Sequence, residues 1–152
     1  MDRRDMLTLL GAGAVGWSAL AGREARAQHP HHHDKAHGDC LAACTKCAEV
    51  CNETFHYCFG HLKDGHKEHA RAATLTIDCH DFCDLAADML ARESDMMGHA
   101  CSACAEVCRA CAAECKEHDD PQTRECYEAC AACEQACRAM AAHMKDHQHH
   151  AE

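Results

Sequence analysis

Cysteine recurs along this chain at steps of three and four residues, and this spacing limits the folds that the chain can adopt. Over 101–115 the steps are three, four, three and four, and over 126–137 they are four, three and four. Residues three and four apart share one face of an α-helix, so each run marks a single stripe along a helix. A helical bundle normally fills such a stripe with Leu and Ile, whereas here the stripe consists of sulfur.

Two further runs complete a pattern of four helices. One has the same spacing, with Thr54 in place of a cysteine: Cys40, Cys44, Cys47, Cys51 and Cys58. The other holds only Cys79 and Cys83 and continues through small and apolar residues to Leu90. The predicted helices are 39–62, 66–92, 97–118 and 121–147.

The helix ends and the connections predict how these helices are arranged. Asp39 and Asp120 are the predicted N-caps, and Pro121 suits a first turn. Short connections favour antiparallel neighbours, and no alternating apolar pattern indicates a strand. We therefore predict an all-α, antiparallel up-down-up-down four-helix bundle with a cysteine-lined core.

Apolar side chains alone are too few to hold this bundle together. Beyond Ala27 only eleven residues are Leu, Ile, Val or Phe, far below the roughly one-fifth that hydrophobic folding usually requires. Cross-links along the cysteine stripes must add stability, and either disulfides or metal ions can supply them. The choice between the two determines the function.

The N-terminal segment is typical of an export signal. Arg3-Arg4 precede an apolar run over 6–20, and 25–27 has the small-x-small form of a cleavage site. The paired arginines favour the twin-arginine route and a periplasmic location. The expected organisation is a signal peptide over 1–27, a flexible His-rich tail over 28–38, the bundle over 39–147 and a C-terminal tail over 148–152.

Charge and hydropathy narrow the range of partners. The formal net charge of −10 at pH 7 disfavours nucleic acid, because phosphate binding needs a basic face. The apolar run of the signal is short for a membrane span. We expect no nucleic-acid partner and, after cleavage, no membrane association.

Three interpretations of the cysteines are open. A disulfide-stapled bundle suits an exported chain with an even cysteine count, but cysteines at these steps have their nearest neighbours in their own helix, where disulfide geometry is poor. A thiol redox enzyme places a reactive Cys-x-x-Cys pair at a helix start, whereas pairs such as Cys108 and Cys111 fall within helices. Repetition of the pair favours the third interpretation, the binding of many metal ions.

The donor set indicates which metal. One or two zinc sites of four ligands would leave most cysteines without a role, and iron–sulfur clusters use other spacings. Cu(I) favours thiolate and thioether ligands, and thiolates that each bridge two ions would hold about one Cu(I) per cysteine. Metal–thiolate bonds would then replace the missing apolar core. The predicted ligands are Cys40, Cys44, Cys47, Cys51, Cys58, Cys79, Cys83, Cys101, Cys104, Cys108, Cys111, Cys115, Cys126, Cys130, Cys133 and Cys137.

Methionine and histidine gather where one end of the bundle is predicted. The connection between the second and third helices and the end of the fourth fall together, and we expect a copper entrance there formed by Met96, Met97, His99, Met140, His143 and Met144. His33 and His37 fall at this end too. At the opposite end, His61 and His118 are better explained as surface residues than as a second entrance. Four other histidines, at 56, 66, 69 and 80, are expected to be exposed.

The chain resembles the bacterial copper storage proteins, in particular their exported branch. The resemblance rests on Arg3-Arg4, on the first helix with Cys58, and on the dense runs over 101–115 and 126–137. It implies a Cu(I)-filled core, an entrance of Met and His at one open end, association as tetramers, and storage or sequestration without catalytic turnover. The heavy His content and the cysteine-poor second helix depart from the family pattern. A detoxifying sponge or a chaperone that passes copper on is the alternative role.

Overall fold

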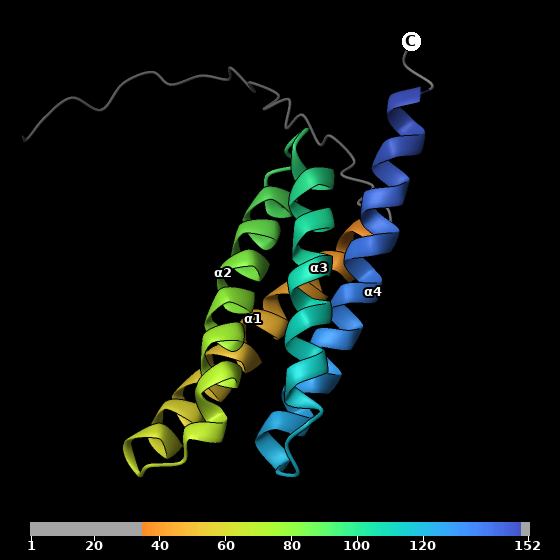
Figure 1. Ribbon diagram of the computed structural model, residues 1–152. Helices are drawn as coiled ribbons and strands as arrows, with labels where there is room; N and C mark the ends of the chain where they lie inside the picture. Colours follow the sequence, from red (N-terminus) through yellow and green to blue (C-terminus); the bar gives the residue numbers. More distant parts are fainter. Residues whose placement is uncertain (1–34, 150–152) are drawn as a thin grey trace, which may run out of the picture. The chain divides into compact units, whose positions relative to one another are not determined.

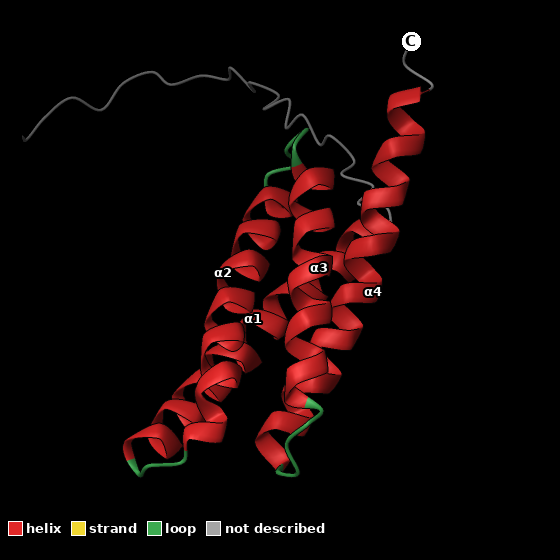
Figure 2. Cartoon of the chain, viewed as in Figure 1, coloured by secondary structure: helices red, strands yellow, loops and turns green. Residues whose placement is uncertain are grey.

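The computed structural model describes residues 35–149, with side chains through Asp146, and shows four helices joined by short turns (Figure 1). α1 spans Lys35–Lys63, α2 Ala70–Ala91, α3 Met97–Cys115 and α4 Pro121–His149, and a 3-10 turn, η1, covers Lys67–His69. No strand occurs within the described residues (Figure 2). The all-α prediction is confirmed. The predicted signal peptide and most of the His-rich tail, with His33, lie outside the described residues.

The helices form a closed ring of four antiparallel neighbours. α1 packs against α2 and α4, and α3 packs against the same two helices, while the diagonal pairs meet only through side chains, such as Cys40 and Cys101, whose sulfur atoms lie 3.9 Å apart. The α2–α3 connection lies at one end, which we call the upper end, and the other two connections lie at the lower end (Figure 1). α1 and α3 therefore run downward, and α2 and α4 run upward.

The helix boundaries correct one prediction and confirm another. α1 begins at Lys35, and Asp39 lies inside the helix, where it pairs with Lys35 one turn earlier. Asp39 is therefore not an N-cap, because this ion pair and the following turn extend the helix into the predicted tail. Asp120 does cap α4: its Oδ1 accepts a hydrogen bond of 3.0 Å from the backbone N–H of Thr123. α3 ends at Cys115, three residues earlier than expected.

The interior of the bundle is made of small side chains. All sixteen cysteines are fully buried, and the larger apolar groups among them are few, chiefly Val50, Leu90 and Met140. A buried free cysteine behaves as a small hydrophobic residue, so the metal-free bundle is held by many small contacts and few large ones. None of the helices in the described range is both long and apolar enough to span a bilayer.

Candidate metal centre

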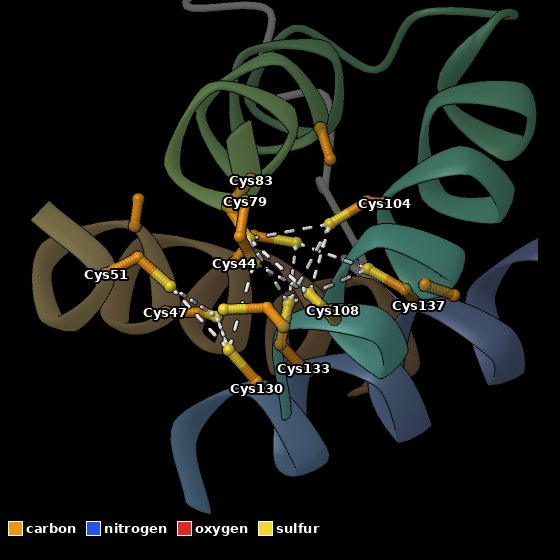
Figure 3. Close-up of a cluster of buried hydrophobic side chains, with 14 of the residues drawn as sticks. Cys44, Cys47, Cys51, Cys79, Cys83, Cys104, Cys108, Cys130, Cys133 and Cys137 are labelled. Carbon is orange, nitrogen blue, oxygen red and sulfur yellow. Dashed lines mark hydrogen bonds between the residues drawn. The ribbon is translucent and has the colours of Figure 1, made fainter. Parts of the chain in front are cut away.

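The buried thiols form a connected lattice along the bundle. Fourteen of the cysteines fall into five groups, and within each group all sulfur atoms lie within 4.8 Å of one another. From the upper to the lower end the groups are Cys40, Cys101 and Cys137; Cys44, Cys104, Cys133 and Cys137; Cys47, Cys83, Cys108 and Cys133; Cys47, Cys51, Cys79 and Cys130; and Cys51, Cys111, Cys126 and Cys130. Each group shares a cysteine with the next, so the lattice is continuous. Figure 3 shows its central sulfur atoms, from all four helices, pointing toward one another.

The closest sulfur neighbours lie on different helices. Cys44 Sγ lies 3.4 Å from Cys137 Sγ, and Cys79 Sγ lies 3.6 Å from Cys108 Sγ, whereas sulfurs one turn apart in the same helix are 3.8–4.0 Å apart. The prediction that the nearest neighbours share a helix is wrong, because small side chains let adjacent helices approach until their sulfurs meet. All sixteen thiols are free.

These distances suit ions that are shared between thiolates. A zinc–thiolate bond is about 2.3 Å long, so two such bonds span at most about 4.6 Å, and the close sulfur pairs of the lattice, from 3.4 Å for Cys44–Cys137 to 4.0 Å for Cys133–Cys137, fall within that reach. Every sulfur is shielded from water, and the donors are soft. A soft cation of low coordination number, such as Cu(I), fits this donor set.

The environment of two of the thiols, Cys101 and Cys58, raises their pKa and favours the protonated form. The contact with Cys137 lowers the pKa of Cys101, but the contact with Cys40 and burial outweigh it and raise the pKa to about 12. Burial, followed by the nearby charge of Asp120, raises the pKa of Cys58 to about 11. At neutral pH each ion that binds such a thiol must therefore displace a proton.

The upper end brings part of the predicted entrance together. Met140 is buried with 2% exposure, and Met97 and Met144 pack against the same core. The start of α3 lies directly on α4, since a Cβ built at Gly98 would stand 3.0 Å from Met144 Cβ. His143 is half-buried.

The remaining predicted entrance residues face outward. Met96 is 54% exposed and His99 is exposed, but His99 lines a cavity of about 300 Å³ together with Met144 and Asp95. His37, now within α1, is buried, and its Nε2 lies 2.9 Å from the carbonyl oxygen of Leu90. Thioether and imidazole groups therefore gather at the end of the bundle that holds the first sulfur group.

The lower end contains a stack of imidazole rings. The ring centroids of His61 and His69 are 4.6 Å apart, and those of His69 and His118 are 4.9 Å apart, in near-parallel orientation. His118 and Cys115 also line a cavity of about 290 Å³. Burial lowers the pKa of His69, and the neighbouring His118 and His61 lower it further.

His69 corrects the prediction of an exposed residue. It is buried with 9% exposure, and its Nδ1 has no hydrogen-bond partner among the described residues. It precedes Ala72, Thr76 and Cys79 at steps of three, four and three, so the spacing that identified the cysteines could have identified it. His80 is half-buried with Nδ1 3.1 Å from the carbonyl oxygen of Ala48, whereas His56 and His66 are exposed as predicted.

Comparison with known proteins shows to which protein family this chain belongs. The family model described as copper storage protein matches residues 32–142. The chain belongs to the copper storage protein family. The match covers the whole thiol lattice and confirms the predicted resemblance to the family; the exported branch stays a prediction.

Solved structures of the family are similar to this chain in sequence and in fold. Apo copper storage protein 3 from Bacillus subtilis is 35% identical over 68% of this chain and 97% of its own, with a TM-score of 0.62. A Streptomyces lividans copper storage protein loaded with 10 copper equivalents is 31% identical over 70% of this chain and 84% of its own, with a TM-score of 0.65. A Cu(I)-bound form of the Bacillus subtilis protein is 32% identical over 70% of this chain and 99% of its own, with a TM-score of 0.63. No curated protein sequence matches the chain.

Proposed function

We propose that this copper storage protein holds many Cu(I) ions per chain on its core thiolates, as a store or sequestering protein without catalytic turnover. The observation that carries the proposal is the continuity of the lattice: five sulfur groups follow one another along the bundle, and each shares a ligand with the next. A bridging thiolate can therefore serve two ions, which single isolated sites cannot do. The Cu(I)-bound and copper-loaded forms of related proteins support the choice of metal.

Binding is an exchange of protons for metal. Each Cu(I) that binds a neutral thiol releases one proton, so loading leaves the core with no additional charge. Two-coordinate Cu(I) needs no water or carboxylate ligand, which suits sulfurs that are fully buried. The bound ions then link helices that share few large apolar contacts.

Copper enters at the upper end in this proposal. Met97, Met140 and Met144 continue the sulfur stripes of α3 and α4 beyond the first group of thiols, and two of them are only half-buried. Thioether and imidazole ligands bind Cu(I) without the charge of a thiolate, so an ion can pass from them to the thiolates. The outward-facing Met96 and His99 would be the first groups to meet the ion.

Separate observations support the proposed location and the proposed assembly. The paired arginines and the cleavage-site pattern over 1–27 support export by the twin-arginine route to the periplasm. Phe82 and Leu85 on α2 are large, apolar and partly exposed, which supports contact between bundles and the tetramer expected from the resemblance. The net charge of −10 supports a role without nucleic acid.

The competing function is a disulfide-stapled structural bundle. An anaerobic Cu(I) titration of the reduced chain, with free thiols counted before and after, separates the two. We expect uptake on the order of a dozen ions, with the loss of reactive thiols in step. Uptake of one or two ions, or isolation of the protein with few free thiols, would favour the scaffold. Transfer of copper to an acceptor would indicate the chaperone role.

A further inference from the structure

Three buried threonines lie where the sulfur lattice ends. The last group of thiols includes Cys51 and Cys126, and Cys79 belongs to the group above it. One step of three residues from each, toward the lower end, reaches the following positions: Thr54 on α1, Thr76 on α2 and Thr123 on α4. All three are fully buried, and Cys115 of α3 occupies the corresponding position four residues beyond Cys111.

These hydroxyl groups are already engaged in hydrogen bonds. Thr54 Oγ1 donates to the carbonyl oxygen of Val50 at 2.8 Å and accepts from Gln122 Nε2 at 3.1 Å. Thr76 Oγ1 donates to the carbonyl oxygen of Ala72 at 2.8 Å. A neutral hydroxyl is a hard donor that binds Cu(I) poorly. The threonine layer, defined as Thr54, Thr76 and Thr123, therefore offers no ligand that could continue the chain of bridging sulfurs.

The hydroxyl group of Thr123 is also engaged in a hydrogen bond, in this case with a residue beyond the layer toward the lower end. Its Oγ1 donates to Asp120 Oδ2 at 2.8 Å, and Asp120 is the cap that fixes the start of α4. The layer is thus tied by hydrogen bonds to the framework of the bundle.

Cys58 lies beyond the threonine layer. It belongs to none of the five sulfur groups and packs in a separate small cluster with Ala72 and Ala73, bordered by Phe55, Tyr57 and Leu62. Cys115 also belongs to none of the five groups, but it differs from Cys58 because it packs in the main core cluster that contains Cys111 and Cys126.

We infer that the threonine layer terminates the copper lattice, so that Cys58 stays a metal-free thiol when the other fifteen cysteines are loaded. This inference rests on the proposed storage function and sets its limit: residue 54 determines how far the store extends. A cysteine at residue 54 would stand three residues from Cys51 and four from Cys58, which is the spacing of the lattice itself. It would join Cys58 to the bridged sulfurs.

The test compares Cu(I) capacity in four variants of the full mature chain by anaerobic titration against a chromogenic Cu(I) chelator. Cys58→Ser should bind as many ions as the wild type, whereas Cys133→Ser, which removes a thiol shared by two groups, should bind fewer. Thr54→Cys should gain about one or two ions per chain. Thr54→Ser is the matched control and should leave the capacity unchanged.

Combining the substitutions makes the test independent of small errors in absolute stoichiometry. Cys58→Ser should lower the capacity in the Thr54→Cys background and have no effect when residue 54 is threonine. A loss of one or more ions for Cys58→Ser alone would overturn the inference while leaving the storage function intact. Uptake of only one or two ions by the wild type would overturn the storage proposal, and this inference with it.

A direct measurement covers the case in which a Thr54 variant fails to fold. Anomalous diffraction at the copper edge from crystals of the fully loaded wild-type protein should show copper peaks along the five groups and none bonded to Cys58 Sγ. A copper peak bonded to Cys58 would overturn the inference without any substitution.

Discussion

The upper and lower ends of this bundle differ in chemistry although the same helices form both. The core-facing stripes of the four helices together form a seam along the bundle. At the upper end the side chains of this seam change from thiols to thioethers, with Met97 on α3 and Met140 on α4. At the lower end they change from thiols to hydroxyl groups, next to a cap carboxylate and stacked imidazoles. The heptad positions are equivalent, so the fold does not impose the difference. A bundle can therefore set the length and the direction of a metal store by the residue type in each layer.

The largest expected effect is the stabilisation of the whole bundle by Cu(I), because copper bound to the thiolates would link the four helices between the two ends. A single site occupied at one hundred times its Kd adds about 2.7 kcal/mol of stability, and 1 kcal/mol shifts the Tm of a domain of this size by about 4 °C. Cu(I) loading should raise the Tm by more than about 10 °C, measured by circular dichroism under argon. Equal Tm values with and without Cu(I) would contradict binding in the core.

A second test probes the conventional packing at the upper end of α2. Leu90 is fully buried and is one of the few large apolar groups in the seam. Leu90→Ala should reduce the free energy of unfolding of the reduced, metal-free chain by about 3 kcal/mol, measured by urea denaturation. Met96→Ala, at a side chain of the same end that is 54% exposed, is the matched control and should change it by less than about 0.5 kcal/mol. Similar values for the two would mean that sulfur contacts alone hold this end.

A third test decides which end admits copper. Replacing Met96, Met97, Met140 and Met144 by Leu keeps the apolar volume and removes the thioethers, so loading should slow by about tenfold while the final capacity stays the same. Stopped-flow measurement of Cu(I) transfer from a weak chelator gives the rate. The matched variant at the lower end replaces His61 and His118 by Gln and should load at the wild-type rate. Slower loading in the His variant alone would move the entrance to the lower end.

The smallest expected effect concerns pH and the lower end alone. Because the pKa of His69 is lowered in the folded chain, folding favours its neutral form, and this contribution is present above the unfolded value of about 6.5. It is lost as pH falls through that value toward the lower folded pKa. The Tm of the metal-free chain should therefore fall more between pH 7.5 and 5.5 in the wild type than in His69→Gln. An equal loss in both would show that His69 does not sense pH.

The sequence predicted the parts of this structure that depend on periodicity. Steps of three and four residues identified four helices and a sulfur-lined seam, and the Asp120-Pro121 pair located the start of α4. Asp39 was misassigned because an N-cap and the second member of an i,i+4 ion pair look alike in a sequence. His69 falls within the predicted second helix, 66–92, but it was missed because the stripe of that helix was followed upstream only as far as Ala72; the structure places His69 in the η1 turn before α2.

What the sequence determined by itself is which residues share a stripe, because the α-helix fixes that relation locally. The fold class, the soft donor set and the preference for Cu(I) all follow from the stripe. Only the tertiary structure decided which stripes face one another and at what level. The 3.4 Å contact of Cys44 with Cys137 joins residues 93 positions apart, and no local rule sets that register. The same long-range packing placed Thr54, Thr76 and Thr123 in one layer and Cys58 beyond it. These residues belong to stripes that lie far apart in the sequence, and only the contact between helices aligns the ends of those stripes.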